Sequence, residues 1–483
     1  MRYNVIARLL GFLILSISAN MLGSLAWAIY FKEAVWQHLL LSMVISGLLG
    51  WGLVWLGKNH KDTHLSRREA MLMVGGGWFV AGLVGALPFY LSGWIPHYYD
   101  AFFETISGFT TTGASILTDI EALPKGLLFW RSYTHWLGGM GIIVLFVAIF
   151  PFLEISGKKM YQFEVPGPDV GGLKPKIQTS AFILWAIYVG ISVAETFALW
   201  AAGMTLYDAM CHTFGTMATG GFSTKNTSVG FYDSPLIHLI ITLFMVIAGA
   251  NFSLYYFLLK GKLTQVYRDT ELRVYLLIIA GSTVVFTYLL YTKDFFASLF
   301  SSWVCAIFNV VSIMTTTGYG TTDTDLWPML TKVWLLILMF IGGCGGSTGG
   351  GIKVVRYVML LKYAYAQIIN SYSPQRKFVV KLAGKPVSQP IIDRTLGFFF
   401  LYLFVYGIGI LVVAAYGYDW PVTISSVAAC LNNIGPGFSL VGATGNYAFM
   451  APFPKVFLAI YMVAGRLELF AVLICLVPDF WKR

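Results

Sequence analysis

Ten apolar runs, each close to the length that crosses a lipid bilayer, constrain this chain more than any other feature. A transmembrane helix needs about 20 apolar residues, because each residue rises about 1.5 Å across roughly 30 Å of hydrocarbon. Only 11% of the 483 residues are charged, too few for the surface of an ordinary soluble protein. We therefore expect an all-α integral membrane protein. The runs cover residues 9–31, 38–57, 71–95, 128–153, 177–203, 235–259, 274–292, 331–361, 396–418 and 454–478.

Lys and Arg residues are concentrated in alternate connections between these runs, which predicts the orientation of the chain. They cluster in residues 58–68, 158–176, 260–273 and 353–394. Basic connections stay on the cytoplasmic side of a membrane, so both termini are expected to be cytoplasmic. The formal net charge of +10 then reflects topology and predicts no nucleic-acid partner. On the outer side, acidic residues such as Asp100 and Glu104 would attract cations.

A fourfold internal repeat appears along the spans. Each time, one span is followed by a shorter apolar segment, a glycine in a small polar cluster, and a second span. We call the four clusters turns 1 to 4. They read Thr110-Thr111-Thr112-Gly113-Ala114, Ala218-Thr219-Gly220-Gly221-Phe222, Thr315-Thr316-Thr317-Gly318-Tyr319 and Asn432-Asn433-Ile434-Gly435-Pro436.

The segments that precede the turns align without gaps. Asp208-Ala209 lies as far before Gly221 as Asp100-Ala101 lies before Gly113. This spacing favours Gly221 over its neighbour Gly220 as the equivalent of Gly113. Four residues further along, polar residues occupy equivalent positions in the four segments. These residues are Glu104, His212, Asn309 and Ser426.

The short segments have too few residues to cross the membrane, so each is expected to enter from outside, turn and return. Non-helical backbone at membrane depth is tolerated only where protein buries it or water lines it. Small residues also pack helices, but four equivalent turns favour one central pore. Helix C-termini and backbone carbonyls directed at its centre would suit a cation such as K⁺. The predicted potassium ligands are the carbonyl oxygens of Thr111, Thr112, Gly113, Thr219, Gly220, Gly221, Thr316, Thr317, Gly318, Asn433, Ile434 and Gly435.

A glycine-rich segment, Gly342 to Gly351, interrupts the run 331–361. It holds seven glycines in ten residues, and each glycine costs a helix about 1 kcal/mol relative to alanine. We expect a broken helix and a gate loop below turn 3 that closes the pore at rest. A phosphate-binding loop is the alternative, but the Walker pattern needs Gly-Lys-Ser or Gly-Lys-Thr, which is not the sequence after Gly351. The predicted gate residues of the loop are Gly345, Gly346, Ser347, Thr348 and Gly349.

Arg466 is a second candidate gate, because it lies inside the last apolar run. A charged side chain there is costly and faces protein or water in preference to lipid. One interpretation is a packing contact with Glu468 or a helix end. The other places its guanidinium beside the pore, as an electrostatic barrier to cations.

Other polar residues in the spans have less specific interpretations. Glu195 is either a proton-coupling carboxylate or a hydrogen-bond partner of a neighbouring helix, and the second is favoured. Arg131 and His135 are expected to bind turn carbonyls or interfacial groups. The five cysteines lie in apolar stretches without CxxC spacing, which argues against disulfides and zinc. No HExxH, GxSxG or Walker pattern is present, so an enzyme is not predicted.

The four turns, read as TTTGA, ATGGF, TTTGY and NNIGP, resemble those of the Trk/Ktr/HKT superfamily of potassium transporters. The resemblance covers the whole chain. The length, the additional hairpin at about 9–57, GGCGGSTGGGIK (Gly342 to Lys353) and AGRLELF (Ala464 to Phe470) resemble its TrkH family in particular. Relatives that favour Na⁺ carry serine at the position of Gly113, so the resemblance points to K⁺, with Rb⁺ also passing. Turn 4, with Ile434 and Pro436, departs from the pattern and predicts weaker selectivity.

The resemblance also implies how such a protein works. It implies K⁺ uptake across a bacterial inner membrane, with K⁺ as the substrate ion and no covalent cofactor. It implies a homodimer in membrane lipid, with one pore per subunit and a cytosolic nucleotide-binding regulatory subunit of the TrkA type. It supports Arg466 as a barrier beside the pore. A symporter that couples H⁺ or Na⁺ to K⁺ is the alternative, although such folds usually have inverted repeats.

The expected domain organisation follows from the spans and turns. The hairpin comprises residues 1–57, and the four pore repeats comprise 71–153, 177–260, 274–368 (with the gate loop) and 396–478. Segment 365–394 is either an amphipathic interfacial helix or a docking loop, and the sequence leaves both open.

Overall fold

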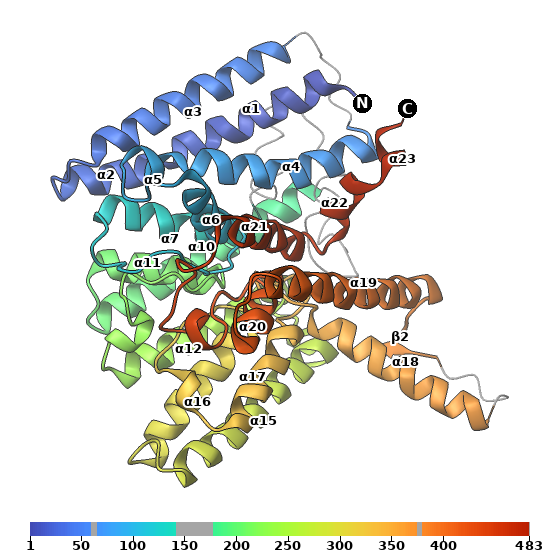
Figure 1. The fold of residues 1–483 in the computed structure, drawn as a ribbon. Helices are drawn as coiled ribbons and strands as arrows, with labels where there is room; N and C mark the ends of the chain where they lie inside the picture. Colours follow the sequence, from blue (N-terminus) through green and yellow to red (C-terminus); the bar gives the residue numbers. More distant parts are fainter. Residues whose placement is uncertain (59–64, 142–176, 374–378, 483) are drawn as a thin grey trace.

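The computed structural model describes residues 1–58, 65–141, 177–373 and 379–482. Within these residues the regular secondary structure is helical apart from one short antiparallel hairpin, in which β1 (Lys381–Leu382) pairs with β2 (Lys385–Pro386). The predicted all-α fold class is therefore confirmed (Figure 1). The end of the predicted repeat 71–153 and the basic residues of 158–176 lie outside the described residues.

An N-terminal hairpin precedes the repeats. It consists of α1 (Tyr3–Asn20), α2 (Leu22–Tyr30) and α3 (Trp36–Leu56). Figure 1 shows α1 lying between α3 and α4 (Arg67–Gly85). A Cβ added at Gly11 would lie 2.6 Å from the Gly50 carbonyl oxygen, so α1 and α3 approach as closely as glycine allows.

Each repeat has an outer helix, a short pore helix and an inner helix. Repeat 1 contains α4, α5 (Leu87–Leu91), α6 (Tyr98–Phe109) and α7 (Lys125–Gly139). Repeat 2 contains α10 (Ile177–Ala201), α11 (Leu206–Met217), η2 (Ser228–Phe231), α12 (Pro235–Gly249), α13 (Phe252–Leu259) and α14 (Leu263–Tyr267). Repeat 3 contains α15 (Thr270–Thr292), α16 (Leu299–Met314), η3 (Thr324–Leu326), α17 (Met329–Ile341) and α18 (Val354–Tyr372). Repeat 4 contains α19 (Gln389–Ala414), α20 (Trp420–Leu431), η4 (Ser439–Val441), α21 (Pro452–Arg466), α22 (Phe470–Leu473), η5 (Ile474–Leu476) and α23 (Pro478–Trp481).

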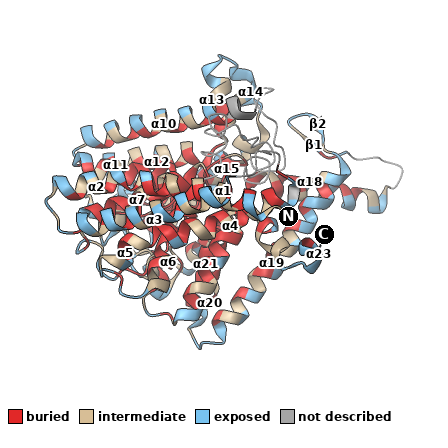
Figure 2. Cartoon of the chain, turned by 90° about the horizontal axis from the view of Figure 1, so that it is seen from above, coloured by how far each residue is buried: buried red, intermediate tan, exposed pale blue. Residues whose placement is uncertain are grey.

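The repeats close into a ring in chain order. The inner helix of each repeat packs against the pore helix of the next: α7 on α11, α12 on α16, α17 on α20, and α21 on α6. Seen from above in Figure 2, buried residues gather inside the bundle and exposed residues on its outward faces. Large apolar side chains such as Trp51 on α3 and Phe197 on α10 are exposed, as expected for helices that face lipid.

Six helices in the described part of the chain are long and apolar enough to cross a membrane, and eight if each bent pair counts as one span. The inner spans predicted at 235–259 and 454–478 are each bent into two helices. The first bends by 95° between α12 and α13, where the Asn251 side chain accepts the Ser253 N–H and starts a new helix. The second bends by 118° after α21, where Glu468 and Leu469 have positive φ.

The two remaining predicted spans have different outcomes. The run 331–361 is broken between α17 and α18, as its glycines predicted. The run 128–153 contains α7, and its residues from 142 onward lie outside the described part. Segment 365–394 is neither a single helix nor a single loop, because α18 continues to Tyr372 and α19 begins at Gln389.

Candidate functional site

All four pore helices end in the same hydrogen-bonded cap. In repeat 1 the Thr111 N–H donates to the Gly108 carbonyl and the Thr112 N–H to the Ser107 carbonyl, at 3.0 and 2.9 Å. This is the Schellman arrangement, in which a left-handed residue ends the helix. The same pair of bonds closes the other pore helices, with the second donated by Gly220, Thr317 and Ile434 at 2.7, 2.8 and 2.9 Å.

The residue that ends each helix is not a glycine. Thr111, Thr219, Thr316 and Asn433 have φ of 55°, 55°, 61° and 55°. Two residues later each chain has a glycine with positive φ, and these are Gly113, Gly221, Gly318 and Gly435, at 81°, 79°, 80° and 91°. The shared backbone identifies Gly221, rather than Gly220, as the equivalent of Gly113.

The four glycines pack the turns into a closed ring. A Cβ added at Gly113 would collide with the Gly220 carbonyl of turn 2, and one at Gly221 with the Thr317 carbonyl of turn 3. A Cβ at Gly318 would likewise meet the Ile434 carbonyl of turn 4. The ring closes where a Cβ at Gly435 would meet the Thr112 carbonyl of turn 1. Any side chain at these positions would therefore displace a neighbouring carbonyl group.

The twelve residues predicted as ion ligands thus come together around one axis. Their N–H groups are partly used by the helix caps, whereas their carbonyl oxygens are almost unused. Among the described residues, the Gly435 carbonyl is the only one of the twelve that accepts a hydrogen bond, from Tyr447 Oη at 2.9 Å. Buried carbonyl groups normally find partners, so a ring of free oxygens suits a cation.

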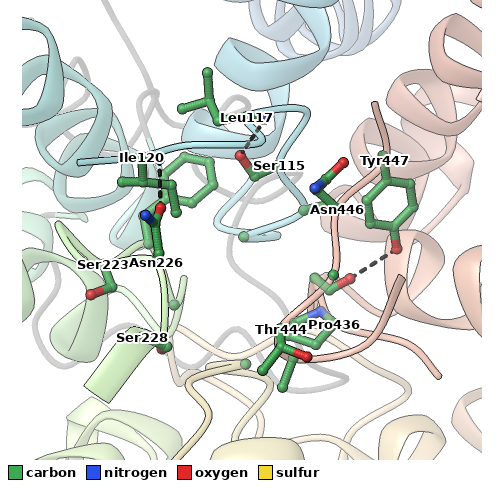
Figure 3. A pocket seen from close by; sticks show the side chains of 18 of the residues that line it. Ser115, Leu117, Ile120, Ser223, Asn226, Ser228, Pro436, Thr444, Asn446 and Tyr447 are labelled. Carbon is green, nitrogen blue, oxygen red and sulfur yellow. Dashed lines mark hydrogen bonds between the residues drawn. The ribbon is translucent and has the colours of Figure 1, made fainter. Parts of the chain in front are cut away.

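A cavity of about 120 Å³ opens on the outer side of the ring (Figure 3). The glycines of all four turns line it. Asn226, on its wall, donates to the Asp119 carboxylate and lowers the pKa of that group below its ordinary value. Burial raises the pKa of Asp325, whose carboxylate accepts the Ser439 N–H and joins the outer segments of repeats 3 and 4.

The predicted gate loop lies directly beneath the turns and is buried. The Gly350 N–H donates to Thr316 Oγ1 of turn 3 at 2.6 Å. A Cβ added at Gly349 would lie 2.9 Å from the Thr315 carbonyl oxygen. Gly346 accepts from the Phe252 N–H at the bend of the repeat 2 inner helix, and Thr348 donates to the Ala248 carbonyl of α12. Ser347 bonds within the loop, to the Cys344 carbonyl.

Arg466 joins the gate loop to the opposite side of the ring. Its Nη1 donates to the Thr348 carbonyl at 2.6 Å and to Thr111 Oγ1 of turn 1 at 3.1 Å. Its Nη2 donates to the carbonyls of Gly138 and Gly139, at the end of α7, at 2.7 Å each. The two predicted gates are therefore one connected structure. Glu468, the alternative partner considered for Arg466, pairs with Arg356 instead.

Three side chains that the sequence did not single out also hold the gate loop. Glu271 of α15 accepts the Gly345 N–H at 2.7 Å and the Val355 N–H at 3.0 Å, at the two ends of the loop. Lys353 Nζ donates to the Gly349 carbonyl, and Arg356 on α18 pairs with Glu468. For Lys353 and Arg356 the available signal was a charge directly after the glycine-rich segment, because a buried charge requires a partner. Glu271 lies 74 residues before Gly345 and had no such local signal.

The structure tests several expectations for single polar residues. Glu104 and Asp100 do not form an open acidic vestibule, because Glu104 is 1% exposed and Asp100 pairs with Lys455 at 2.7 Å. Neither carboxylate oxygen of Glu195 has a hydrogen bond of standard geometry among the described residues, but Thr216 of the neighbouring helix α11 lies close enough to interact with the carboxylate, in line with the favoured expectation. Arg131 and His135 bind carbonyl groups next to the turns and not within them: that of Ser223, which follows turn 2, and that of Gly108, in the last turn of α6.

Four re-entrant pore helices whose caps form a ring of carbonyls beneath an outer cavity define a multi-pass membrane protein of the pore-loop cation transport class. Comparison with known proteins agrees. The profile of the TrkH family, described as a cation transport protein, matches residues 36–483. The chain belongs to the TrkH family.

Individual relatives are similar over their full lengths. The Trk system potassium uptake protein TrkH of Salmonella typhimurium is 39% identical, and that of Escherichia coli K12 38% identical, each over 100% of both chains. The crystal structure of the potassium transporter TrkH from Vibrio parahaemolyticus matches with a TM-score of 0.89 and 35% identity, over 100% of both chains. The resemblance inferred from the turns is confirmed.

Proposed function

We propose that this protein takes up K⁺, and also passes Rb⁺, across a bacterial inner membrane through the ring formed by turns 1 to 4. The observation that carries the proposal is the closed ring of four equivalent turns with free carbonyl oxygens. Oxygens at fixed spacing can replace the hydration shell of a desolvated cation. The potassium uptake named for the relatives from Salmonella typhimurium and Escherichia coli supports the same ion.

Turn 4 is expected to bind the ion least well of the four turns. Its carbonyl at Gly435 already accepts from Tyr447, and its Ile434 replaces the threonine found in turns 1 and 3. We therefore expect a preference for K⁺ over Na⁺ that is real but smaller than in a ring of four identical turns.

The gate loop and Arg466 form the resting barrier of the proposed pore. The loop extends from turn 3, through Gly350, to the Arg466 guanidinium, which itself contacts turn 1. Turns 1 and 3 are opposite members of a ring built in chain order, so the loop crosses the conduction axis. The positive charge of Arg466 adds an electrostatic barrier to any cation below the ring.

Opening then requires the loop to leave the axis. The loop continues into α18, which extends away from the bundle toward the predicted cytoplasmic side (Figure 1). A cytosolic nucleotide-binding subunit of the TrkA type, bound to a homodimer with one pore in each subunit, would move the loop through this helix. Both termini lie on one side of the molecule in Figure 1, which supports their common cytoplasmic placement.

The test is uptake of radioactive rubidium into proteoliposomes that contain the purified protein alone, with K⁺ or Na⁺ as competitor. Inhibition by K⁺ but not by Na⁺ supports the proposal. Gly113→Ser is the companion variant, and we expect Na⁺ to compete better in it because the added side chain displaces the Gly220 carbonyl. A wild-type protein that K⁺ and Na⁺ inhibit equally would contradict the proposed selectivity.

Glu195 supports a second candidate, a symporter that couples H⁺ to K⁺. Its carboxylate is fully buried on α10, and both oxygens lack hydrogen-bond partners among the described residues. Burial without such partners is costly for a carboxyl group, and in the proposed symporter this group would gain and lose the transported proton. In a symporter the reversal potential shifts with the pH gradient, and Glu195→Gln abolishes the shift. In a channel it stays at the K⁺ equilibrium potential at every pH.

A further inference from the structure

A buried ion pair lies beside the ring, and its arginine, Arg131, also lines the cavity next to the ring glycines. Arg131 Nε on α7 donates to Glu104 Oε1 on the pore helix α6 at 2.7 Å. The two side chains are 2% and 0% exposed. A charge pair removed from water survives only when its remaining hydrogen-bonding groups are also used.

The other hydrogen bonds of Glu104 hold the segment of chain that follows turn 1. Its Oε1 also accepts from Ser115 Oγ, and its Oε2 accepts the Ile116 N–H, at 2.9 Å each. These residues follow Gly113 directly, so the carboxylate fixes the chain immediately beyond the ring glycine to the helix that leads into the ring.

Arg131 reaches in the other direction, to turn 2. Its Nη1 donates to the Ser223 carbonyl at 3.0 Å, and its guanidinium lies 3.5 Å from the centroid of the Phe222 ring. Phe222 follows the ring glycine Gly221 directly. One ion pair therefore connects the chain beyond the ring glycines of two adjacent turns.

His135 supports the same connection one helical turn along α7. Its Nε2 accepts the Phe222 N–H at 3.2 Å, so its Nδ1 carries the proton and donates to the Gly108 carbonyl at 2.7 Å. Its ring centroid lies 4.0 Å from that of Phe222. Phe222 is thus held by both Arg131 and His135.

The equivalent positions in the other repeats carry neutral and more local bonds. His212 Nε2 bonds Ser223 Oγ at 2.9 Å, and Asn309 Nδ2 bonds Thr321 Oγ1 at 2.9 Å, each within its own repeat. Ser426 bonds its own helix at Thr423. Among the described residues at these four positions, Glu104 alone forms an ion pair, whereas His212 meets the next turn through its backbone carbonyl, which accepts from Tyr319 Oη at 3.0 Å.

We propose that Glu104 and Arg131 are positioning residues that set the spacing of turns 1 and 2, and thereby the discrimination of K⁺ from Na⁺. The inference rests on the proposed function. Neither side chain contacts the axis, so each acts through the backbone that it holds. Loss of the pair leaves a pore that still conducts but whose carbonyls adapt to the smaller Na⁺.

The test is the K⁺ to Na⁺ permeability ratio, taken from reversal potentials of the full-length protein in bilayers. Glu104→Gln keeps the shape of the side chain but removes the charge that binds Arg131 and replaces one of the two accepting oxygens by an NH₂ donor. We expect the ratio to fall by about tenfold with conduction retained, because sub-ångström shifts of coordinating groups have effects of this order. Arg131→Lys keeps the positive charge but loses the second guanidinium nitrogen that reaches the Ser223 carbonyl. It should lower the permeability ratio by a smaller factor.

Asp100→Asn is the matched control, because Asp100 lies on the same helix and pairs with Lys455 at 2.7 Å without contacting a turn. It should leave the ratio unchanged. If Glu104→Gln does not yield folded protein, Ser115→Ala removes one bond of the carboxylate and should lower the ratio slightly. If the folded variants keep the wild-type K⁺ to Na⁺ permeability ratio, the inference about Glu104 and Arg131 is wrong and the proposed function still stands. A wild-type protein without K⁺ preference overturns the proposed function as well.

Discussion

The ring of turns and the layer directly beneath it are built in opposite ways. In the ring, four segments of different sequence share one backbone, with a left-handed residue and then a glycine of positive φ. In the layer beneath, the three inner helices whose continuation the structure describes end in different ways. α12 bends by 95°, α17 runs into the gate loop, and α21 ends at Arg466 before a 118° bend.

This difference reflects what each layer has to do. Coordination of a spherical ion by backbone oxygens requires equal distances from all sides, so the four copies keep the same geometry. A barrier needs only one element that can move and one that can hold it. In the proposed function repeat 3 supplies the loop that moves and repeat 4 the arginine that holds it, while carbonyl groups of repeats 1 and 2 accept their hydrogen bonds.

The largest effect is expected where the symmetry of the ring itself is broken. Gly318→Ala places a methyl group against the Ile434 carbonyl in a backbone with φ of 80°. We expect rubidium uptake to fall by about 100-fold, because a misplaced coordinating group has an effect of this order. Gly93→Ala is the control, since Gly93 also has positive φ, at 77°, but has open space around it. Equal losses in both variants would show that backbone strain, and not the ring, is responsible.

The next effect concerns the barrier. Arg466→Ala removes the bonds to Thr348, Thr111 and the end of α7. We expect rubidium uptake in the absence of a partner protein to rise about tenfold. This corresponds to a free-energy barrier to conduction that is lower by about 1.4 kcal/mol. Arg466→Lys keeps the charge with fewer donors and should give an intermediate rate. An unaltered rate in the alanine variant would contradict the barrier.

A smaller effect is expected within the gate loop. Gly346 has φ of 76°, and an added Cβ would lie 2.9 Å from Asn251 Oδ1. Gly346→Ala therefore destabilises the resting loop by about 1 kcal/mol, and uptake should rise about fivefold. Gly384→Ala, at φ of 80° in the hairpin between β1 and β2, is the control and should not change uptake. Unchanged uptake in both would show that the loop is not a gate.

The smallest effect concerns the attachment of the loop to α15. Glu271→Gln keeps one acceptor oxygen for the Gly345 and Val355 N–H groups but loses the charge that strengthens both bonds. We expect uptake to rise about twofold, since a charge-assisted bond is only moderately stronger than a neutral one. Asp393→Asn, on the exposed start of α19, is the control. A fall in uptake after Glu271→Gln would mean that this contact supports the open state instead.

Much of the ring could be predicted from sequence because its determinants are local. Equal spacing of Asp100 and Asp208 from their glycines located the turns and distinguished Gly221 from Gly220. The glycines of the gate loop predicted the break after α17. The bends after Gly249 and Arg466 were missed, because each stretch is apolar enough to read as a continuous span and the bends depend on Asn251 and on Glu468-Leu469.

The sequence by itself determined the class of fold, the four turns and the break of the third inner helix at its glycine-rich segment. Hydrophobic length and turn chemistry act over a few residues, so they can be read without knowing the partners of a segment. Only the tertiary structure decided that the turns close in chain order, that Arg466 binds the gate loop, and that Glu104 pairs with Arg131. These contacts join residues far apart in the chain, and the cost of burying charged and polar groups without partners selects them.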